Sequence, residues 1–183
     1  MRGELKTYQA KRRFGETPEP KGAKTRRKAA APLRYLVQRH AATRLHYDFR
    51  IEHDGVLKSW AVTKAPSRDP SVKRLAVEVE DHPVDYGSFE GTIPAGNYGA
   101  GTVQLWDTGS WTPQNPDTLE ADFARGSVKM TLDGERLKGG WALVRLKSDR
   151  GKPSRRNNWL LIKEKDDHAV PGEGDALAEL DAS

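Results

Sequence analysis

Between residues 33 and 163, short apolar or alternating stretches recur at intervals that are typical of β-strands. They cover residues 34–38, 44–52, 56–62, 74–80, 101–106, 128–132, 141–147 and 159–163. Turns rich in glycine and aspartate separate several of them, at 53–55, 107–109 and 133–140. Many short strands at such spacing predict a β-barrel or a β-sandwich, and we find no internal repeat.

Two segments alone have helical character. Residues 6–13 form the first, and residues from about 118 to 125 form the second, capped by Asp117 or Thr118. The sequence therefore predicts a mainly β protein with one or two short peripheral helices.

The amino-acid composition excludes several kinds of metal site and catalytic group. The 183 residues include no cysteine, which excludes disulfides, thiolate metal sites and cysteine nucleophiles, so a metal would need the five histidines or the carboxylates. No apolar run approaches the ~18 residues of a membrane span, and the first residues lack the apolar segment of a signal peptide. We expect a soluble, cytoplasmic protein that binds no membrane.

The net charge of +5 is unevenly distributed along the chain. Residues 1–28 hold ten Lys and Arg against three acids, whereas residues 164–183 hold one Lys against seven acids. We expect a basic N-terminal arm and linker over 1–32, a β-barrel domain over 33–163 and an acidic C-terminal tail over 164–183, which is either disordered or the start of a linker. Within the arm, residues 21–32 resemble a flexible basic linker, and the sequence favours a solvated tail over a segment that slides along phosphates by counterion release.

Residues 44–52 alternate without a break, and this stretch carries most of the candidate chemistry. A strand places one set of side chains on each face. Tyr47, Phe49 and Ile51 make one face apolar, and the other face carries His46, Asp48, Arg50 and Glu52. Imidazole, carboxylate and guanidinium at successive positions of one face can bind a metal and the anion that the metal polarises.

His40 precedes His46 by six residues, which leaves room for a turn that returns the chain beside itself. His40, His46 and Asp48 would then form a site of two histidines and one carboxylate. Such a set leaves positions open for water and substrate, as a catalytic ion requires.

A second group of candidates is cationic. Lys64 follows the strand that ends at Val62, and Arg74 opens the next strand. If both side chains converge on Arg50, three positive charges surround one metal, an arrangement that suits a phosphate under attack.

Five ordered blocks, residues 34–40, 45–50, 60–66, 80–86 and 89–99, resemble the 3′-phosphoesterase domain of bacterial DNA ligase D. The resemblance runs from about residue 8 to residue 163. It implies a compact, closed β-barrel of about eight strands with a central cavity, which heals DNA 3′ ends in non-homologous end joining.

The same resemblance implies a manganese enzyme with two activities, although zinc or another divalent metal also suits the ligands. One activity removes a 3′-terminal ribonucleoside and leaves a 3′-phosphate, and the other hydrolyses that phosphate to a 3′-hydroxyl. The implied partners are a DNA primer-template with a 3′-ribonucleotide or 3′-phosphate end, and polymerase and ligase domains of the same system. Whether the 2′-hydroxyl of a ribonucleotide end attacks or serves for recognition stays open.

Residue roles follow from the matching positions. The resemblance makes His40, His46 and Asp48 the metal ligands and brings Arg50 and His82 to the scissile phosphate. The remaining polar positions of the cavity are Gln38, Lys64, Arg74, Glu80 and Tyr86, and Arg12 and Glu19 of the N-terminal arm match residues implicated in activity. His82 either donates a proton to the leaving oxygen or holds a phosphate oxygen, and Glu80 and Glu52 are candidates to orient the ligand histidines.

One position departs from the family pattern. The family has an acidic residue just before the phenylalanine of the arm, where this chain has Arg13 before Phe14.

Two other interpretations remain open at this point. One is a cupin-like oxygenase with non-haem iron, since two histidines and a carboxylate also suit that metal. The other is a non-catalytic nucleic-acid-binding barrel, in which Trp60, Trp106, Trp111, Trp141 and Tyr98 stack on bases.

Overall fold

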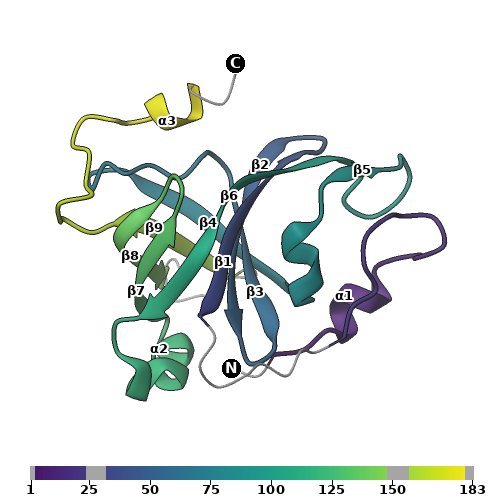
Figure 1. Cartoon of the computed structure of the whole chain (residues 1–183), viewed down its shortest axis with the longest axis horizontal. Helices are drawn as coiled ribbons and strands as arrows, with labels where there is room; N and C mark the ends of the chain where they lie inside the picture. Colours follow the sequence, from purple (N-terminus) through teal and green to yellow (C-terminus); the bar gives the residue numbers. More distant parts are fainter. Residues whose placement is uncertain (1–2, 24–31, 148–156, 180–183) are drawn as a thin grey trace.

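In the computed structural model, which describes residues 3–23, 32–147 and 157–179, the chain forms a closed antiparallel β-barrel (Figure 1). The strands are β1 (Leu33–Ala41), β2 (Leu45–His53), β3 (Val56–Val62), β4 (Lys73–His82), β5 (Gly91–Ile93), β6 (Gly101–Pro113), β7 (Ser127–Gly134), β8 (Lys138–Arg145) and β9 (Asn158–Lys163). Among these described strands, eight follow the order β1-β2-β3-β4-β9-β8-β7-β6, and β6 pairs back with β1. The predicted mainly β, closed barrel is confirmed.

The long strand β6 makes the closure geometrically feasible. It pairs with β1 along most of its length, with β7 over Gly109–Pro113, and with β5 over Gly101–Val103. The sequence predicted only its first half, residues 101–106, because Gly109 and Pro113 interrupt the apolar pattern. The three-residue strand β5 lies outside the closed ring and was not predicted.

Aromatic and aliphatic side chains fill the interior of the barrel. Tyr47, Phe49 and Ile51 of β2 belong to this core, as do Trp60 and Trp159. Trp111 and Trp141 are also fully buried there, so the interior is a packed core. The prediction of a central cavity is therefore wrong, because the apolar face of β2 turns inward and its polar face turns outward.

A second, smaller cluster lies on the outer face of the barrel wall. It consists of Tyr8, Leu36, Leu57 and Tyr86, with Phe14 packed against it. Leu36 and Leu57 alternate with core residues of β1 and β3, so this cluster faces away from the barrel interior.

The helices are short. They are α1 (Lys6–Ala10), the 3₁₀ turns η1 (Val84–Ser88) and η2 (Pro116–Thr118), α2 (Leu119–Arg125) and α3 (Ala176–Glu179). The predicted helix at 118–125 is confirmed, and Gly126 ends it in the left-handed conformation at φ 82°. Thr118 does not cap a backbone N–H; its hydroxyl donates to Asp122 instead, at 3.0 Å. In the described ranges no helix has both the length and the apolar character of a membrane span.

The described part of the N-terminal arm, residues 3–23, packs against the barrel (Figure 1). Tyr8 on α1 is completely buried, and its hydroxyl donates a hydrogen bond to the Pro20 carbonyl. The Gly3 and Glu4 backbone N–H groups bind the carboxylates of Asp54 and Asp81. Most of the expected linker, residues 24–31, lies outside the described residues.

One expectation for the acidic C-terminal segment, disorder, is wrong for residues 164–179. Lys163 Nζ binds Asp166 at 2.7 Å, and Arg68 Nε donates to Glu173 at 2.8 Å. Leu177 of α3 joins the barrel core at 3% exposure. The acids of this segment therefore pair with cations of the barrel, which a count of charges alone does not show.

Burial of Leu177 gives a test of this packing. We expect Leu177→Ala to lower the free energy of unfolding by about 2 to 4 kcal/mol, because the substitution leaves a cavity in the core. Urea denaturation should show a lower midpoint with an unchanged slope, and Val170→Ala, at an exposed position of the same segment, should change neither. Equal midpoints for Leu177→Ala and the unaltered protein would contradict this packing.

Candidate metal and phosphate site

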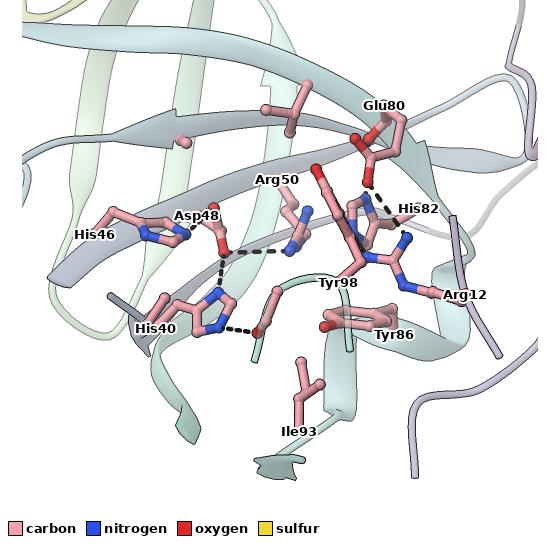
Figure 2. Close-up of a pocket in the computed structure, with 14 residues that line it drawn as sticks. Arg12, His40, His46, Asp48, Arg50, Glu80, His82, Tyr86, Ile93 and Tyr98 are labelled. Atoms are coloured by element: carbon pink, nitrogen blue, oxygen red, sulfur yellow. Dashed lines mark hydrogen bonds and ion pairs between the residues drawn. The ribbon is translucent and has the colours of Figure 1, made fainter. Parts of the chain in front are cut away.

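The polar face of β2 opens into a cavity of about 230 Å³ on the outer side of the barrel (Figure 2). Its lining residues are Arg12, His40, Ala42, His46, Asp48, Arg50, Ala61, Val79, Glu80, His82, Tyr86, Ile93, Tyr98 and Gly99. They come from β1 to β4, η1, the segment around β5 and the N-terminal arm. The barrel supplies one wall of the cavity, and segments distant in sequence supply the others.

The register of the β1–β2 hairpin brings the two candidate histidines together. His40 lies directly opposite His46, and Gln38 lies opposite Asp48. Directly opposed residues share a face of the sheet, so the turn between Ala41 and Leu45 places all these side chains side by side. The predicted return of the chain beside itself is confirmed.

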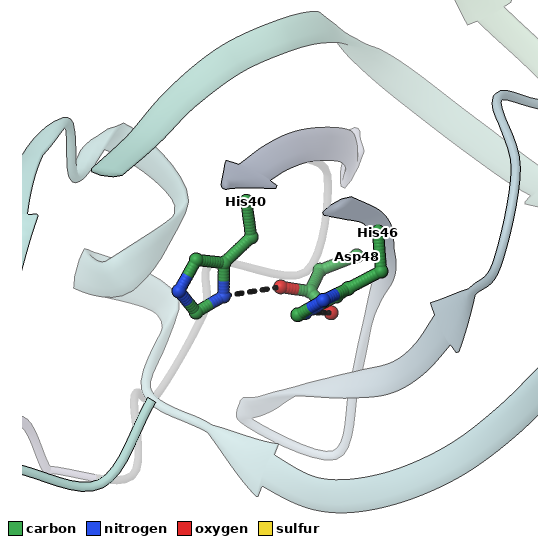
Figure 3. Close-up of side chains that lie close together, drawn as sticks. All are labelled: His40, His46 and Asp48. Atoms are coloured by element: carbon green, nitrogen blue, oxygen red, sulfur yellow. Dashed lines mark ion pairs between the residues drawn. The ribbon is translucent and has the colours of Figure 1, made fainter. Parts of the chain in front are cut away.

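His40, His46 and Asp48 converge on one point (Figure 3). Each offers one nitrogen or oxygen, and these three atoms lie within 4.8 Å of one another. His40 Nδ1 lies 3.6 Å from Asp48 Oδ2, and His46 Nε2 lies 3.3 Å from Asp48 Oδ1.

The second nitrogen of each ring fixes its tautomer. His40 Nε2 lies 2.7 Å from the Gly99 carbonyl, and His46 Nδ1 lies 3.2 Å from the Arg44 carbonyl. A carbonyl oxygen only accepts, so these nitrogens carry the protons. In the neutral rings, His40 Nδ1 and His46 Nε2 therefore turn lone pairs toward the Asp48 carboxylate. Three electron-rich atoms that face one another are a donor set for a cation.

The electrostatics of Asp48 favour the same interpretation. Burial opposes ionisation of this carboxyl, but the Arg50 guanidinium outweighs it, and so do His40 and His46 whenever the nitrogen that faces Asp48 is protonated, so the pKa of Asp48 lies below the ordinary range. Burial lowers the pKa of His46, and the hydrogen bond and charge of Asp48 outweigh it, so the net shift is upward. The site therefore holds a carboxylate that attracts positive charge, and the nitrogen and oxygen ligands fit a divalent ion.

Arg50 stands beside this donor set and is held in place by three partners. Its Nε donates to Gln38 Oε1 at 2.8 Å and its Nη1 donates to Ser59 Oγ at 2.7 Å. Its Nη2 lies 3.4 Å from Asp48 Oδ2, and the guanidinium lies 5.0 Å from the centre of the Tyr86 ring. A guanidinium fixed in this way is preorganised to meet an oxyanion.

Gln38 orients Arg50. The Gln38 side-chain amide donates to the carbonyls of Tyr86 and Phe89, at 2.7 and 3.0 Å. The residue is completely buried and does not line the cavity, so the prediction that Gln38 is one of the polar positions of the cavity is wrong.

His82 is buried between cations. Its Nδ1 donates to the Glu80 carbonyl, and its Nε2 lies 3.2 Å from Arg12 Nη2, from which it accepts. Burial, Arg50 and Arg12 together hold the pKa of His82 well below its usual value, so the ring is neutral at pH 7. The Tyr86 ring contacts it edge-on at 4.7 Å.

The N-terminal arm delivers Arg12 to the same cavity. Glu19 Oε2 accepts from Arg12 Nε at 2.8 Å, and Glu80 Oε1 lies 3.3 Å from Arg12 Nη1. The Glu19 side chain is fully buried, so it positions Arg12 and does not itself face the cavity. Arg13, the departure from the family pattern, is exposed and lies 3.5 Å from Glu16.

Three predictions about this site are wrong in their geometry. Lys64 and Arg74 do not line the cavity; Arg74 donates instead to the Ala65 carbonyl and to Asp175. Lys64 is exposed and also lies near Asp175. Lys64 and Arg74 share this neighbour because Lys64 follows the end of β3 and Arg74 lies at the start of β4. Glu80 does not orient a ligand histidine, since backbone carbonyls fill that role and Glu80 binds Lys11 and Arg12. Nor does Glu52, whose carboxylate accepts the Arg34 backbone N–H.

Two neighbours of the site were not predicted from the sequence. Ser59 anchors Arg50 across the strand pair, and Gly99 anchors His40 through its carbonyl. The glycine-rich segment 89–101 has the composition of a structural loop, yet Tyr98 and Gly99 line the cavity. Gly96 and Gly99 adopt positive φ angles, so these two glycines allow the loop to turn sharply toward the site.

Comparison with known proteins places this site in a family. A model of the DNA ligase D 3′-phosphoesterase domain matches residues 38–145. The chain is 54% identical over 165 residues to the multifunctional non-homologous end joining protein LigD of Pseudomonas aeruginosa, covering 90% of this chain and 19% of that protein. It is 41% identical over 166 residues to LigD of Mycolicibacterium smegmatis, covering 88% of this chain and 21% of that protein.

The LigD protein of Mycobacterium tuberculosis strain H37Rv is 42% identical over 151 residues, covering 80% of this chain and 19% of that protein. The chain thus spans about a fifth of the length of these curated relatives. The family match covers more than half of the chain and includes every candidate metal ligand. This chain therefore belongs to the family of the DNA ligase D 3′-phosphoesterase domain.

Proposed function

We propose that this protein is a metal-dependent phosphoesterase that heals DNA 3′ ends for double-strand break repair. The observation that carries the proposal is the set of three lone pairs on His40, His46 and Asp48, directed at one point beside the anchored Arg50 guanidinium. In this proposal the barrel domain over 33–163, together with the N-terminal arm, carries the activity. The acidic segment over 164–183 follows the barrel domain in the sequence.

His40 Nδ1, His46 Nε2 and one Asp48 oxygen would hold a divalent ion, and Mn²⁺ suits this nitrogen and oxygen set. When bound, such an ion supplies Lewis acidity to a phosphate oxygen or lowers the pKa of a bound water. Arg50 stabilises the negative charge that develops on the phosphate, because its three partners keep the guanidinium at the rim of the donor set.

Arg12 and His82 hold a second phosphate oxygen in this proposal. The oxygen enters between them and takes over the N–H that Arg12 gives to His82 Nε2. The negative charge of the oxygen raises the pKa of His82, so that Nε2 takes up a proton and then donates a hydrogen bond to the same oxygen. His82 thus acts as a phosphate ligand and not as the proton donor to the leaving group.

Two hydrolyses follow from one phosphate position. In the first, a water oxygen bonds to phosphorus, the bond between phosphorus and O5′ of the terminal ribonucleoside breaks, and O5′ leaves with a proton. The primer then ends in a 3′-phosphate. In the second, a water oxygen bonds to that phosphorus, the bond to O3′ breaks, and O3′ leaves with a proton as the new 3′-hydroxyl.

The partners we propose are a DNA primer-template with a 3′-ribonucleotide or 3′-phosphate end, and the polymerase and ligase domains of the same repair system in the bacterial cytoplasm. The name of the P. aeruginosa relative describes a multifunctional end-joining protein, and the matched segment is a minor part of it.

The test is a primer-template that ends in one ribonucleotide, incubated with Mn²⁺, with another divalent metal and with a chelator. We expect the ribonucleotide end to become a 3′-phosphate and then a 3′-hydroxyl with metal, and to stay unchanged with the chelator. Tight DNA binding without turnover would instead support a non-catalytic barrel, and iron-dependent oxygen consumption would support an oxygenase. Phosphate release at an equal rate in the chelator would contradict the metal assignment.

A further inference from the structure

A second groove adjoins the cavity that contains the candidate metal ligands. It has a volume of about 620 Å³ and runs over the outer side of β4, where Thr7, Lys11, Val77, Glu78 and Asn157 line it. Val79, Glu80 and Tyr98 line both spaces. The two spaces are therefore adjacent, and Tyr98 stands at their junction.

Tyr98 is exposed in an unusual way for an aromatic side chain. Its exposed fraction is 46%, and in the described part of the chain the other large hydrophobic side chains that are exposed are aliphatic. Its hydroxyl accepts from Lys11 Nζ at 3.2 Å, with that ammonium 4.7 Å from the ring centre. The Arg12 guanidinium lies 5.3 Å from the same ring (Figure 2). An exposed ring flanked by two cations is a platform for a nucleobase beside a phosphate.

The loop around Tyr98 is tied to the candidate metal site. The Asn97 backbone N–H donates to the Pro94 carbonyl, and the Ala100 N–H donates to the Asn97 carbonyl. Gly99, which follows Tyr98, accepts a hydrogen bond from His40 Nε2 through its carbonyl. The ring is therefore solvent-exposed but attached to a segment whose position is set by a candidate metal ligand.

Only the first of the two proposed reactions has a nucleoside as its leaving group. The cavity of about 230 Å³ already has to hold the ion and the phosphate, so a nucleoside beyond the phosphate needs further room. The adjoining groove supplies that room, and Tyr98 separates it from the phosphate position.

We infer that Tyr98 is a specificity-determining residue that stacks on the base of the 3′-terminal nucleoside, and that the groove over β4 is the subsite for this leaving nucleoside. The inference rests on the proposed function, whose site it extends. It implies that Tyr98 serves ribonucleoside removal and not hydrolysis of the 3′-phosphate.

The experiment compares Tyr98→Ala, Tyr98→Phe and Tyr98→Trp on two primers, one ending in a ribonucleotide and one in a 3′-phosphate. Loss of one stacked base should raise KM for ribonucleoside removal by roughly 10- to 100-fold in Tyr98→Ala, with kcat nearly unchanged. The Phe and Trp variants should stay close to the unaltered enzyme, and 3′-phosphate hydrolysis should change less than about two-fold in all three.

Two controls isolate the stacking contact. A primer that ends in a ribose without a base should react equally well with Tyr98→Ala and with the unaltered enzyme. Leu146→Ala, which removes an exposed aliphatic side chain that lines neither space, should change neither reaction. Equal losses in both reactions, an unchanged KM in Tyr98→Ala, or a full effect on the base-free end would overturn the inference. An unaltered enzyme that hydrolyses neither primer would instead refute the proposed function.

Discussion

An Asp48→Asn enzyme is expected to lose both hydrolytic reactions by at least about 1,000-fold while it stays folded. Asparagine keeps the shape of the side chain and removes the charge that attracts a cation. Its amide NH₂ can donate to His40 Nδ1 or His46 Nε2, which both face Asp48 with lone pairs, so no buried group is left without a partner. A metal contributes several kcal/mol to transition-state stabilisation, which corresponds to the expected rate loss.

The measurement pairs single-turnover rates on the 3′-phosphate primer with a Mn²⁺ titration and thermal unfolding. We expect Mn²⁺ affinity to fall at least about 100-fold and the melting temperature without metal to stay equal or rise. His168→Ala, an exposed histidine of the C-terminal segment, serves as the control and should match the unaltered enzyme in all three. An Asp48→Asn variant with tight Mn²⁺ binding would show that the ligand set is wrong.

Arg50→Lys is expected to reduce kcat about 100- to 1,000-fold, the loss typical of removing one oxyanion donor. A single ammonium cannot keep the contacts with Gln38, Ser59 and Asp48 and also present two N–H groups to a phosphate. The positive charge remains near Asp48, so Mn²⁺ affinity should change only slightly.

The matched control is Arg39→Lys on β1, where the guanidinium binds Gln104 and does not line the cavity. Steady-state kinetics on the 3′-phosphate primer should give unchanged kcat for the control and a large loss for Arg50→Lys. If both variants kept at least a third of kcat, Arg50 would not stabilise charge in the transition state.

Strand alternation predicted much of this site correctly. The period of two in residues 44–52 separated Tyr47 and Phe49 from Asp48 and Arg50, and the structure places these two sets on opposite faces of β2. The spacing between His40 and His46 predicted a hairpin, and the β1–β2 register confirms it. Both predictions depend on local geometry, which the sequence specifies directly.

Alternation could not tell which face of the barrel wall carries the site. A closed barrel of eight strands fills its interior with side chains, so a polar face that holds Arg50 must turn outward, where η1 and the arm cover it. The prediction that Lys64 and Arg74 converge on Arg50 failed for a related reason. Both lie near the connection between β3 and β4, and Arg74 pairs there with the C-terminal segment.

Contacts between distant segments were the least predictable. Tyr8 of the N-terminal arm is buried against the barrel, and the Gly99 carbonyl bonds to His40. Each contact joins segments that lie far apart in the sequence, and no periodicity predicts it. The high charge of the acidic segment suggested disorder. That prediction failed because composition does not show that Asp166 and Asp175 form ion pairs with cations of the barrel.

The central claim is that one divalent ion binds at the outer face of β2 through two histidines and one aspartate. A crystal grown with Mn²⁺ and measured at the manganese absorption edge tests it most directly. We predict one anomalous peak within about 2 to 2.5 Å of His40 Nδ1, His46 Nε2 and an Asp48 oxygen. A manganese peak surrounded by other residues, or no peak at this site at saturating Mn²⁺, would contradict the claim.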